Sequence, residues 1–219
     1  MKTRTKALLL ALSAVLLVVS TVFATMAYLT SKTGVVKNTF TVGNVNITLD
    51  EAKVNEYGKP VDANGNEVQL ANAPRQTTNT YKLLPGHTYT KDPIVHVTKG
   101  SEECWLFVRV VDQIADIQDA TTVAAQMTAK GWTLVTDETD VWAYNIKVDA
   151  RNEAKDIPVF DRFKLTGTAD VAAYDGKTIT VQAYAIQADG FDTAEAAWDA
   201  APATWGEDTT AAPETTDAP

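Results

Sequence analysis

The sequence is poor in the residues on which most enzymes and disulfide-stabilised domains depend. Its 219 residues include one cysteine, two histidines and four serines. A single cysteine, Cys104, excludes an intramolecular disulfide framework. Its place at the start of an apolar run favours a buried, inert thiol over an intermolecular disulfide. The fold must therefore be held by packing, for which a chain of this length is sufficient.

Motifs for catalysis are also lacking. His87 stands beside a Pro-Gly pair and His96 within a strand pattern, and no His-Glu-x-x-His run brings two histidines onto one helical face. Gly-x-Ser-x-Gly and glycine-rich phosphate loops are absent. We therefore predict no metal ion and no other cofactor, and we assign no catalytic residue.

Basic residues are in the minority. The chain has 19 lysines and arginines against 28 acidic residues, a formal charge of −9. Nucleic acids attract lysine and arginine, so we expect no nucleic-acid partner. Repulsion from anionic membranes and polymers is expected for the same reason.

A long apolar run occurs only at the N-terminus. Three basic residues precede the apolar residues 7–24, and small residues then lead to Ala27. This pattern predicts a signal peptide over residues 1–27, cut by a signal peptidase between Ala27 and Tyr28, and hence a secreted protein. A cut after Ala24 and an uncleaved membrane anchor are the alternatives. Cleavage after Ala27 removes three basic and no acidic residues, which changes the formal charge from −9 to −12.

Most of the remaining chain has the pattern of short strands separated by turns. Strand patterns cover residues 45–49, 81–84, 94–97, 105–111, 132–135, 141–148, 159–165 and 178–186. The run 105–111 is apolar on both faces except for Arg109, which is typical of a central strand covered on both sides. Residues 44–201 are therefore predicted to form one mainly β domain, a jelly-roll-like antiparallel β-sandwich, with the strand order left open.

Two helices and two turns complete this prediction. A helix is expected within residues 119–130, capped by Thr121 or Thr122 and ended by Gly131. A second is expected at residues 192–201, with Asp192 as N-cap and Glu195 completing a capping box. Asn64-Gly65 predicts a hairpin turn, favoured over a calcium loop because the loop's acidic twelfth position is missing. Pro85-Gly86 predicts a second turn.

The two ends of the mature chain differ from the sandwich. Residues 28–43 form an N-terminal strand segment, in which Leu29, Val35, Val36 and Phe40 are the apolar side chains available for a donated strand. Pairing within its own subunit and donation to a neighbouring subunit both remain open. Residues 202–219 are an acidic Thr/Ala/Pro-rich tail that is predicted to be disordered.

Three segments resemble one family. The signal running into Ala-Tyr-Leu-Thr at residues 27–30, followed by the pattern at 38–50, resembles exported proteins with the SipW-dependent type of signal peptide. Residues 83–93 are similar to the Leu-x-Pro-Gly turn of the TasA/camelysin family, and residues 181–191 to the closing region of its clostridial members.

The resemblance implies a secreted structural protein of the extracellular biofilm matrix or cell surface. Such a protein is trimmed by a dedicated signal peptidase and assembles head to tail with itself, and also with related matrix proteins. Its N-terminal strand completes a neighbour's sheet. Two alternatives stay open: a camelysin-like cell-surface metalloendopeptidase, and a non-enzymatic adhesin that uses Trp132, Trp142 or Trp205. Core packing is the expected role of the first two tryptophans.

Overall fold

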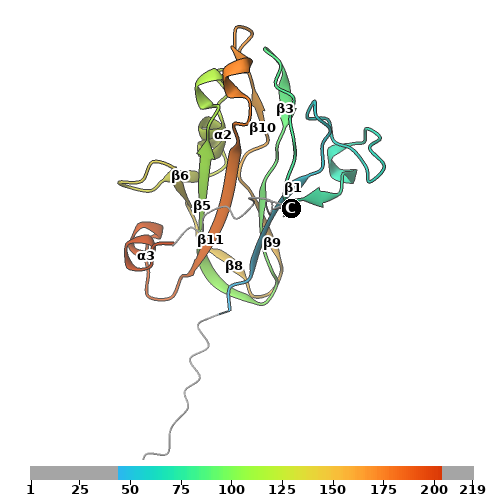
Figure 1. Ribbon diagram of the computed structural model, residues 1–219. Coiled ribbons are helices and arrows are strands. Elements are labelled where there is room, and N and C mark those ends of the chain that lie inside the picture. Colours follow the sequence, from blue (N-terminus) through green and yellow to red (C-terminus); the bar gives the residue numbers. More distant parts are fainter. Residues whose placement is uncertain (1–43, 204–219) are drawn as a thin grey trace, which may run out of the picture. The chain divides into compact units, whose positions relative to one another are not determined.

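Alternating apolar residues produce strands along most of the chain that the structure describes. The computed structural model describes residues 44–203 (Figure 1). Its strands are β1 (Ile47–Ala52), β2 (Arg75–Gln76), β3 (Thr88–Thr90), β4 (Ile94–Val97), β5 (Ser101–Asp112), β6 (Trp132–Leu134), β7 (Val141–Tyr144), β8 (Val148–Ala150), β9 (Lys155–Pro158), β10 (Arg162–Lys164) and β11 (Ile179–Gln187). Its helices are α2 (Val123–Ala129) and α3 (Ala194–Ala200), with short 3-10 turns η1 (Leu70–Asn72), η2 (Ala115–Ile117) and η3 (Val171–Tyr174).

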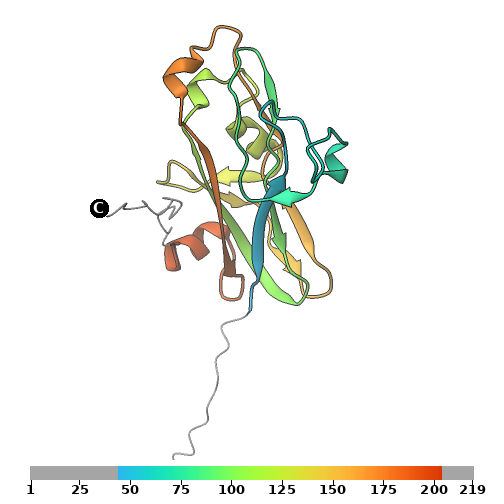
Figure 2. The ribbon, with the colours of Figure 1, turned by 45° about the vertical axis from the view of Figure 1, so that its right-hand side comes forward.

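The strands form two antiparallel sheets that face each other. One sheet has the order β2-β1-β4-β9 and the other the order β11-β5-β7-β6, with β8 also pairing with β5. Strands β10 and β3 form a separate two-stranded ladder. Figures 1 and 2 show the two layers from different sides. The predicted fold class, a mainly β antiparallel sandwich with two short helices, is confirmed.

Strand β5 is the central strand of its sheet, as its two apolar faces predict. It pairs with β11 along one edge and with β7 and β8 along the other. Leu106 and Val108 are fully buried in the core between the sheets, while Trp105 and Phe107 pack on the opposite face. Arg109, the exception in the sequence pattern, donates from Nε to Oδ2 of Asp140 at 2.9 Å.

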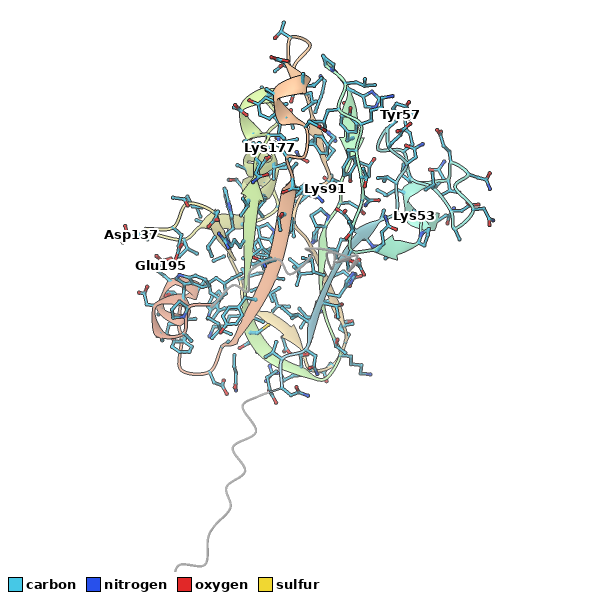
Figure 3. All side chains as sticks on the ribbon, viewed as in Figure 1. Lys53, Tyr57, Lys91, Asp137, Lys177 and Glu195 are labelled. Atoms are coloured by element: carbon cyan, nitrogen blue, oxygen red, sulfur yellow. The ribbon has the colours of Figure 1, made fainter. Side chains whose placement is uncertain are left out.

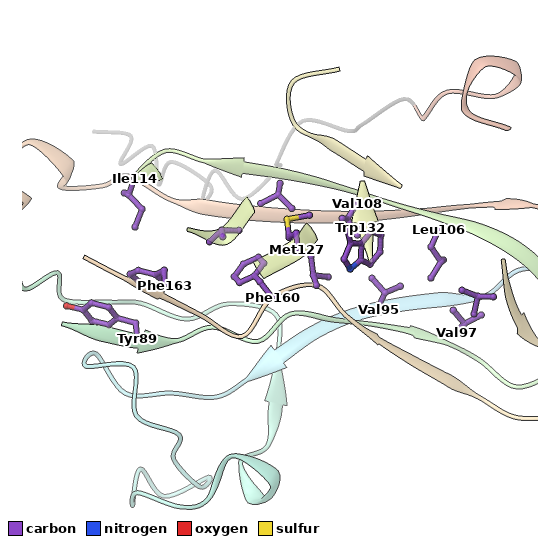
Figure 4. Packing of buried hydrophobic residues seen from close by; sticks show 14 of the residues in the cluster. Tyr89, Val95, Val97, Leu106, Val108, Ile114, Met127, Trp132, Phe160 and Phe163 are labelled. Atoms are coloured by element: carbon purple, nitrogen blue, oxygen red, sulfur yellow. The ribbon is translucent and has the colours of Figure 1, made fainter. Parts of the chain in front are cut away.

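The main core lies between the two sheets and is rich in large side chains. Trp132, Met127 and Phe160 are fully buried there, and Figure 4 shows Trp132 beside Val95 of the opposite sheet. Cys104 is also fully buried, and burial raises the pKa of its thiol to about 12. The expectation that this thiol is buried is confirmed.

A second apolar cluster covers the outer face of the β5 sheet. Helix α3 places Trp198 against Phe107, with ring centroids 5.1 Å apart. Glu195 of the same helix accepts a hydrogen bond from the Thr136 backbone N–H at 3.0 Å, next to Asp137 in Figure 3. The helix thereby ties the β6–β7 connection to the sheet.

Two predicted strands were wrong in their extent. The single strand predicted at 141–148 is divided into β7 and β8, because the chain bends at residues 145–146 and its pairing with β5 changes register, from Phe107 opposite Ala143 to Cys104 opposite Val148. The strand predicted at 159–165 is replaced by β9, which ends at Pro158, and β10. Between them the chain leaves β4 and joins β3. Val159 still donates to the Pro93 carbonyl at 2.9 Å, but Pro93, as a proline, has no N–H to donate in return.

The two predicted turns are confirmed, although one of their flanking strands is not. Gly65 has a φ of 88° and Gly86 a φ of 73°, as left-handed turn positions require. The residues before Pro85 form no strand: Leu84 instead donates its backbone N–H to the hydroxyl of Tyr89 at 2.6 Å.

The helix caps agree with the prediction at one helix only. Thr122 caps α2 by accepting a hydrogen bond from the Ala125 N–H. At α3 the predicted capping box is wrong, because Thr193 rather than Asp192 is the N-cap and accepts from the Ala196 N–H at 3.1 Å. The side chain of Glu195 is turned away from the cap and towards Thr136.

Candidate functional site

Among residues 44–203, the sandwich is open along a seam between β1 and β11. Strand β1 pairs with β4 on one side, and on its other side, of its described residues, Glu51 and Ala52 alone pair with β2. Strand β11 pairs with β5 alone among the described strands. Both strands therefore present an edge to the seam.

Hydrogen-bond alternation identifies the backbone groups at this seam. Thr98 donates to the Asn46 carbonyl, so the alternating antiparallel pattern turns the N–H and C=O groups of Ile47 and Leu49 away from β4. In the same way the bond from Gln113 to the Thr178 carbonyl turns the groups of Ile179 and Val181 away from β5. These groups could bind a further strand.

A cleft of about 1190 Å³ lies between the two edges. The strands β1 and β11 converge towards Ile47 and Gln187 and diverge towards their other ends, as both ribbon views show. The cleft occupies the divergent end, where residues 77–83 and 174–178 form its remaining walls. Figure 3 labels Lys91 and Lys177, two of its lining residues.

Apolar side chains line much of this cleft. The main contributors are Leu49, Tyr81, Leu83, Ile114, Phe163, Val171, Ile179 and Val181. Tyr81 stands edge-on to both Tyr89 and Phe163, with ring centroids 5.8 and 5.3 Å away. Leu49, Ile179 and Val181 pack against the main core but stay partly exposed. The core is therefore continuous with an apolar surface that solvent can reach.

An ion pair lies at the β1 side of the cleft. Lys91 Nζ lies 2.7 Å from Glu51 Oε2, and Asn79 Nδ2 donates to Glu51 Oε1 at 2.8 Å. The side chains of Glu51 and Lys91 are only 6% and 11% exposed. A charge pair at this depth is costly unless its hydrogen bonds are satisfied, so any group that enters here must supply polar partners.

A second charged group lies on β1, β4 and β9. His96 Nε2 lies 3.0 Å from Asp50 Oδ1, and His96 Nδ1 lies 2.7 Å from Asp156 Oδ1. Arg75 joins Asp50 to Asp92 at 2.7 and 2.6 Å. Partial burial alone would lower the pKa of His96, but the hydrogen bonds to the two carboxylates outweigh it and the pKa is raised.

The two histidines do not share a site. His87 lies 2.9 Å from the Tyr57 carbonyl through Nε2 and packs against Tyr89, whereas His96 is held by carboxylates on separate strands. Within residues 44–203 there is no group of three histidine, cysteine or acidic side chains that could hold a metal ion.

The tryptophans considered for adhesion are placed as core residues where they can be seen. Trp132 is fully buried and donates from Nε1 to the Pro158 carbonyl at 3.0 Å. Trp142 packs partly buried against the same core. Trp205 lies outside the described residues.

The predicted functional residues also lie outside the described chain. These are the cleavage pair Ala27 and Tyr28 and the donor-strand residues Leu29, Val35, Val36 and Phe40. The structure instead shows a cleft between β1 and β11 that sequence reasoning missed. One signal was present: the alternation of Val45, Ile47 and Leu49 continues inward to Glu51, a charged residue at a core position.

No family model matches this chain, and no curated protein or solved structure is significantly similar to it. The fold alone therefore defines the class, an antiparallel β-sandwich. No helix in the part of the chain that the structure describes is long and apolar enough to cross a membrane.

Proposed function

We propose that the protein is a secreted structural subunit of an extracellular matrix, which self-assembles by donating residues 28–43 of each subunit to the next. This is the role that the resemblance to the TasA/camelysin family implies. The observation that carries it is the open seam, where two neighbouring strands present edges beside an apolar cleft of about 1190 Å³.

Strand addition is the binding mode that such a seam suits best. An added strand gains main-chain hydrogen bonds from a sheet edge and specificity from pockets for alternate side chains. Leu49, Ile179 and Val181 supply the outward backbone groups, and the cleft supplies apolar walls. Exposed edges otherwise promote uncontrolled association, so proteins usually cover them.

Donation from one copy to the next gives a filament. The donating segment and the accepting seam are different surfaces of one chain, so the contact is heterologous. A heterologous contact that does not close a ring propagates as a fibre. The predicted partner is thus another copy of this chain or a related matrix protein.

The test compares two mature forms of the chain. One begins at Tyr28 and the other at Asn44, and both are followed by size-exclusion chromatography and negative-stain electron microscopy. We expect the longer form to assemble into filaments and the shorter form to stay monomeric. Equal behaviour of the two forms would contradict strand donation.

A further inference from the structure

We propose that the Glu51–Lys91 ion pair recognises the side chain of Asn38 in the donated segment and so determines the register in which that segment enters the cleft. The inference rests on the proposed function, strand donation by residues 28–43. It adds the contact that decides which residues of the segment enter.

The last part of the donated segment, residues 36–42, has one polar residue among the apolar side chains of one face. Residues two apart share a face of a strand, so Val36, Asn38, Phe40 and Val42 would lie together if these residues bind as a strand. The opposite face carries Lys37, Thr39 and Thr41. If the apolar face enters the cleft, the carboxamide of Asn38 is buried with it and needs both a donor and an acceptor.

The ion pair offers both. An ammonium group has three N–H donors, and among the described residues the side chain of Lys91 is bonded to Glu51 alone. Glu51 accepts from Lys91 and Asn79, and its carboxylate oxygens have capacity for a further hydrogen bond. Asn38 could accept from Lys91 through its amide oxygen and donate to Glu51 through its amide nitrogen.

Because water is excluded when the strand binds, the contact between Asn38 and the ion pair determines the register of the strand. Water can complete the hydrogen bonds of Lys91 while the cleft is open, but a strand that fills the cleft removes it. An apolar side chain at this point would leave buried donors without partners. A slip of one residue would turn Lys37 and Thr39 inward and place the apolar face in solvent.

Length and charge favour a second copy as the source of the strand. Residues 28–43 carry Lys32 and Lys37 and no acidic residue, whereas residues 44–203 have 24 acidic and 14 basic residues, a formal charge of −10. Opposite charge favours this encounter between subunits. The 16 residues of the segment span about 50 Å when extended, enough to reach a neighbouring molecule.

The alternation of apolar residues also argues against residues 36–42 continuing β1 within their own subunit. Ile47 and Leu49 face the core at odd positions, but the apolar face of residues 36–42 falls at even positions. A straight continuation of β1 would therefore turn Val36 and Phe40 away from the core of their own subunit. Entry into a neighbour's cleft places them against apolar walls instead.

The test uses synthetic peptides of residues 28–43 as competitors of assembly by the full mature chain from Tyr28. Assembly is followed by light scattering with the unmodified peptide, with Asn38→Leu and with the matched control Thr39→Leu on the opposite face. Asn38→Leu should raise the half-inhibitory concentration by about 10-fold to 100-fold. Thr39→Leu should change it by less than about threefold, because its side chain stays in solvent.

A variant acceptor tests the partner of Asn38. In a mature chain with Glu51→Leu and Lys91→Met, apolar side chains replace the ion pair, and the Asn38→Leu peptide should now inhibit better than the unmodified one. If this double variant does not fold, Glu51→Gln with its neutral amide replaces it, and it should narrow the difference between the two peptides. An unchanged preference in the variant that folds would exclude the ion pair as the partner.

The outcomes separate this inference from the proposed function. If the unmodified peptide inhibits and Asn38→Leu and Thr39→Leu inhibit equally, strand donation stands and recognition of Asn38 is wrong. If no peptide inhibits and the chain from Asn44 assembles like the chain from Tyr28, strand donation itself is wrong.

Discussion

At the scale of single residues, His96 is the most informative side chain outside the cleft. Both of its ring nitrogens lie within 3.0 Å of a carboxylate oxygen, one from Asp50 and one from Asp156. Only the imidazolium form carries a proton on each nitrogen and can donate to both. The arrangement therefore favours the charged histidine, in agreement with its raised pKa.

This arrangement predicts a pH dependence of stability. A raised pKa in the folded state means that the contribution of His96 is complete below its unfolded pKa of about 6.5 and is lost as the pH rises through the folded value. We expect the free energy of unfolding to fall by about 1 kcal/mol at most above pH 6.5, since the pair is partly solvated. Urea denaturation at pH 6 and pH 8.5 measures this difference in the free energy of unfolding.

Two variants control that measurement. His96→Gln should remove the fall, and Asp156→Asn should reduce it. The carboxyl of Asp50 sets the low-pH limit of this stabilisation. Partial burial alone would raise the pKa of Asp50, but hydrogen bonds from His96 and Arg75 outweigh the effect of burial and lower the pKa. Its contribution is therefore present above about pH 3.8 and is lost as the pH falls through the lowered value. An identical pH profile in His96→Gln would contradict this account.

At the scale of secondary-structure elements, helix α3 shows how a sequence pattern can indicate the element and misplace its cap. Asp192 and Glu195 have the spacing of a capping box, yet the cap is Thr193, one residue later. Glu195 is instead used in a tertiary contact with Thr136, 59 residues away in sequence. A long-range hydrogen bond of this kind leaves no mark in the local sequence.

A substitution at the cap distinguishes the two assignments. Thr193→Ala removes the acceptor of the Ala196 N–H and should lower the free energy of unfolding by about 1 kcal/mol. The expected fall in melting temperature is about 2–4 °C. Asp192→Ala, the matched control one residue earlier, should stay within about 0.5 kcal/mol of the unmodified protein, as calorimetry can check. A larger loss of unfolding free energy in Asp192→Ala than in Thr193→Ala would contradict Thr193 as the N-cap and favour the predicted capping box.

The strands show the same division between local and long-range information. The central strand β5 and the strand β11 could be predicted, because alternation and two-sided apolarity are local patterns. The division of residues 141–148 into β7 and β8 could not, since it depends on the change of register against β5. The cleft was likewise hidden, because its walls come from segments more than 100 residues apart.

At the scale of the whole molecule, the central feature is a β-sandwich whose core reaches solvent along one seam. Most of the core is closed: Trp132, Phe160 and Leu106 are fully buried. Along β1 and β11, by contrast, Ile47, Leu49 and the first residues of β11 stay partly exposed. We attribute this opening to assembly, in which a strand from another copy would complete the sandwich.

Amide hydrogen exchange at the seam tests this claim most directly. It compares assembled protein from Tyr28 with the chain from Asn44, residue by residue. We expect the outward amides of Leu49, Ile179 and Val181 to exchange at least about tenfold more slowly in the assembly, because a donated strand hydrogen-bonds to one or both edges. Assembly that leaves these three amides unprotected and slows exchange elsewhere would contradict strand donation.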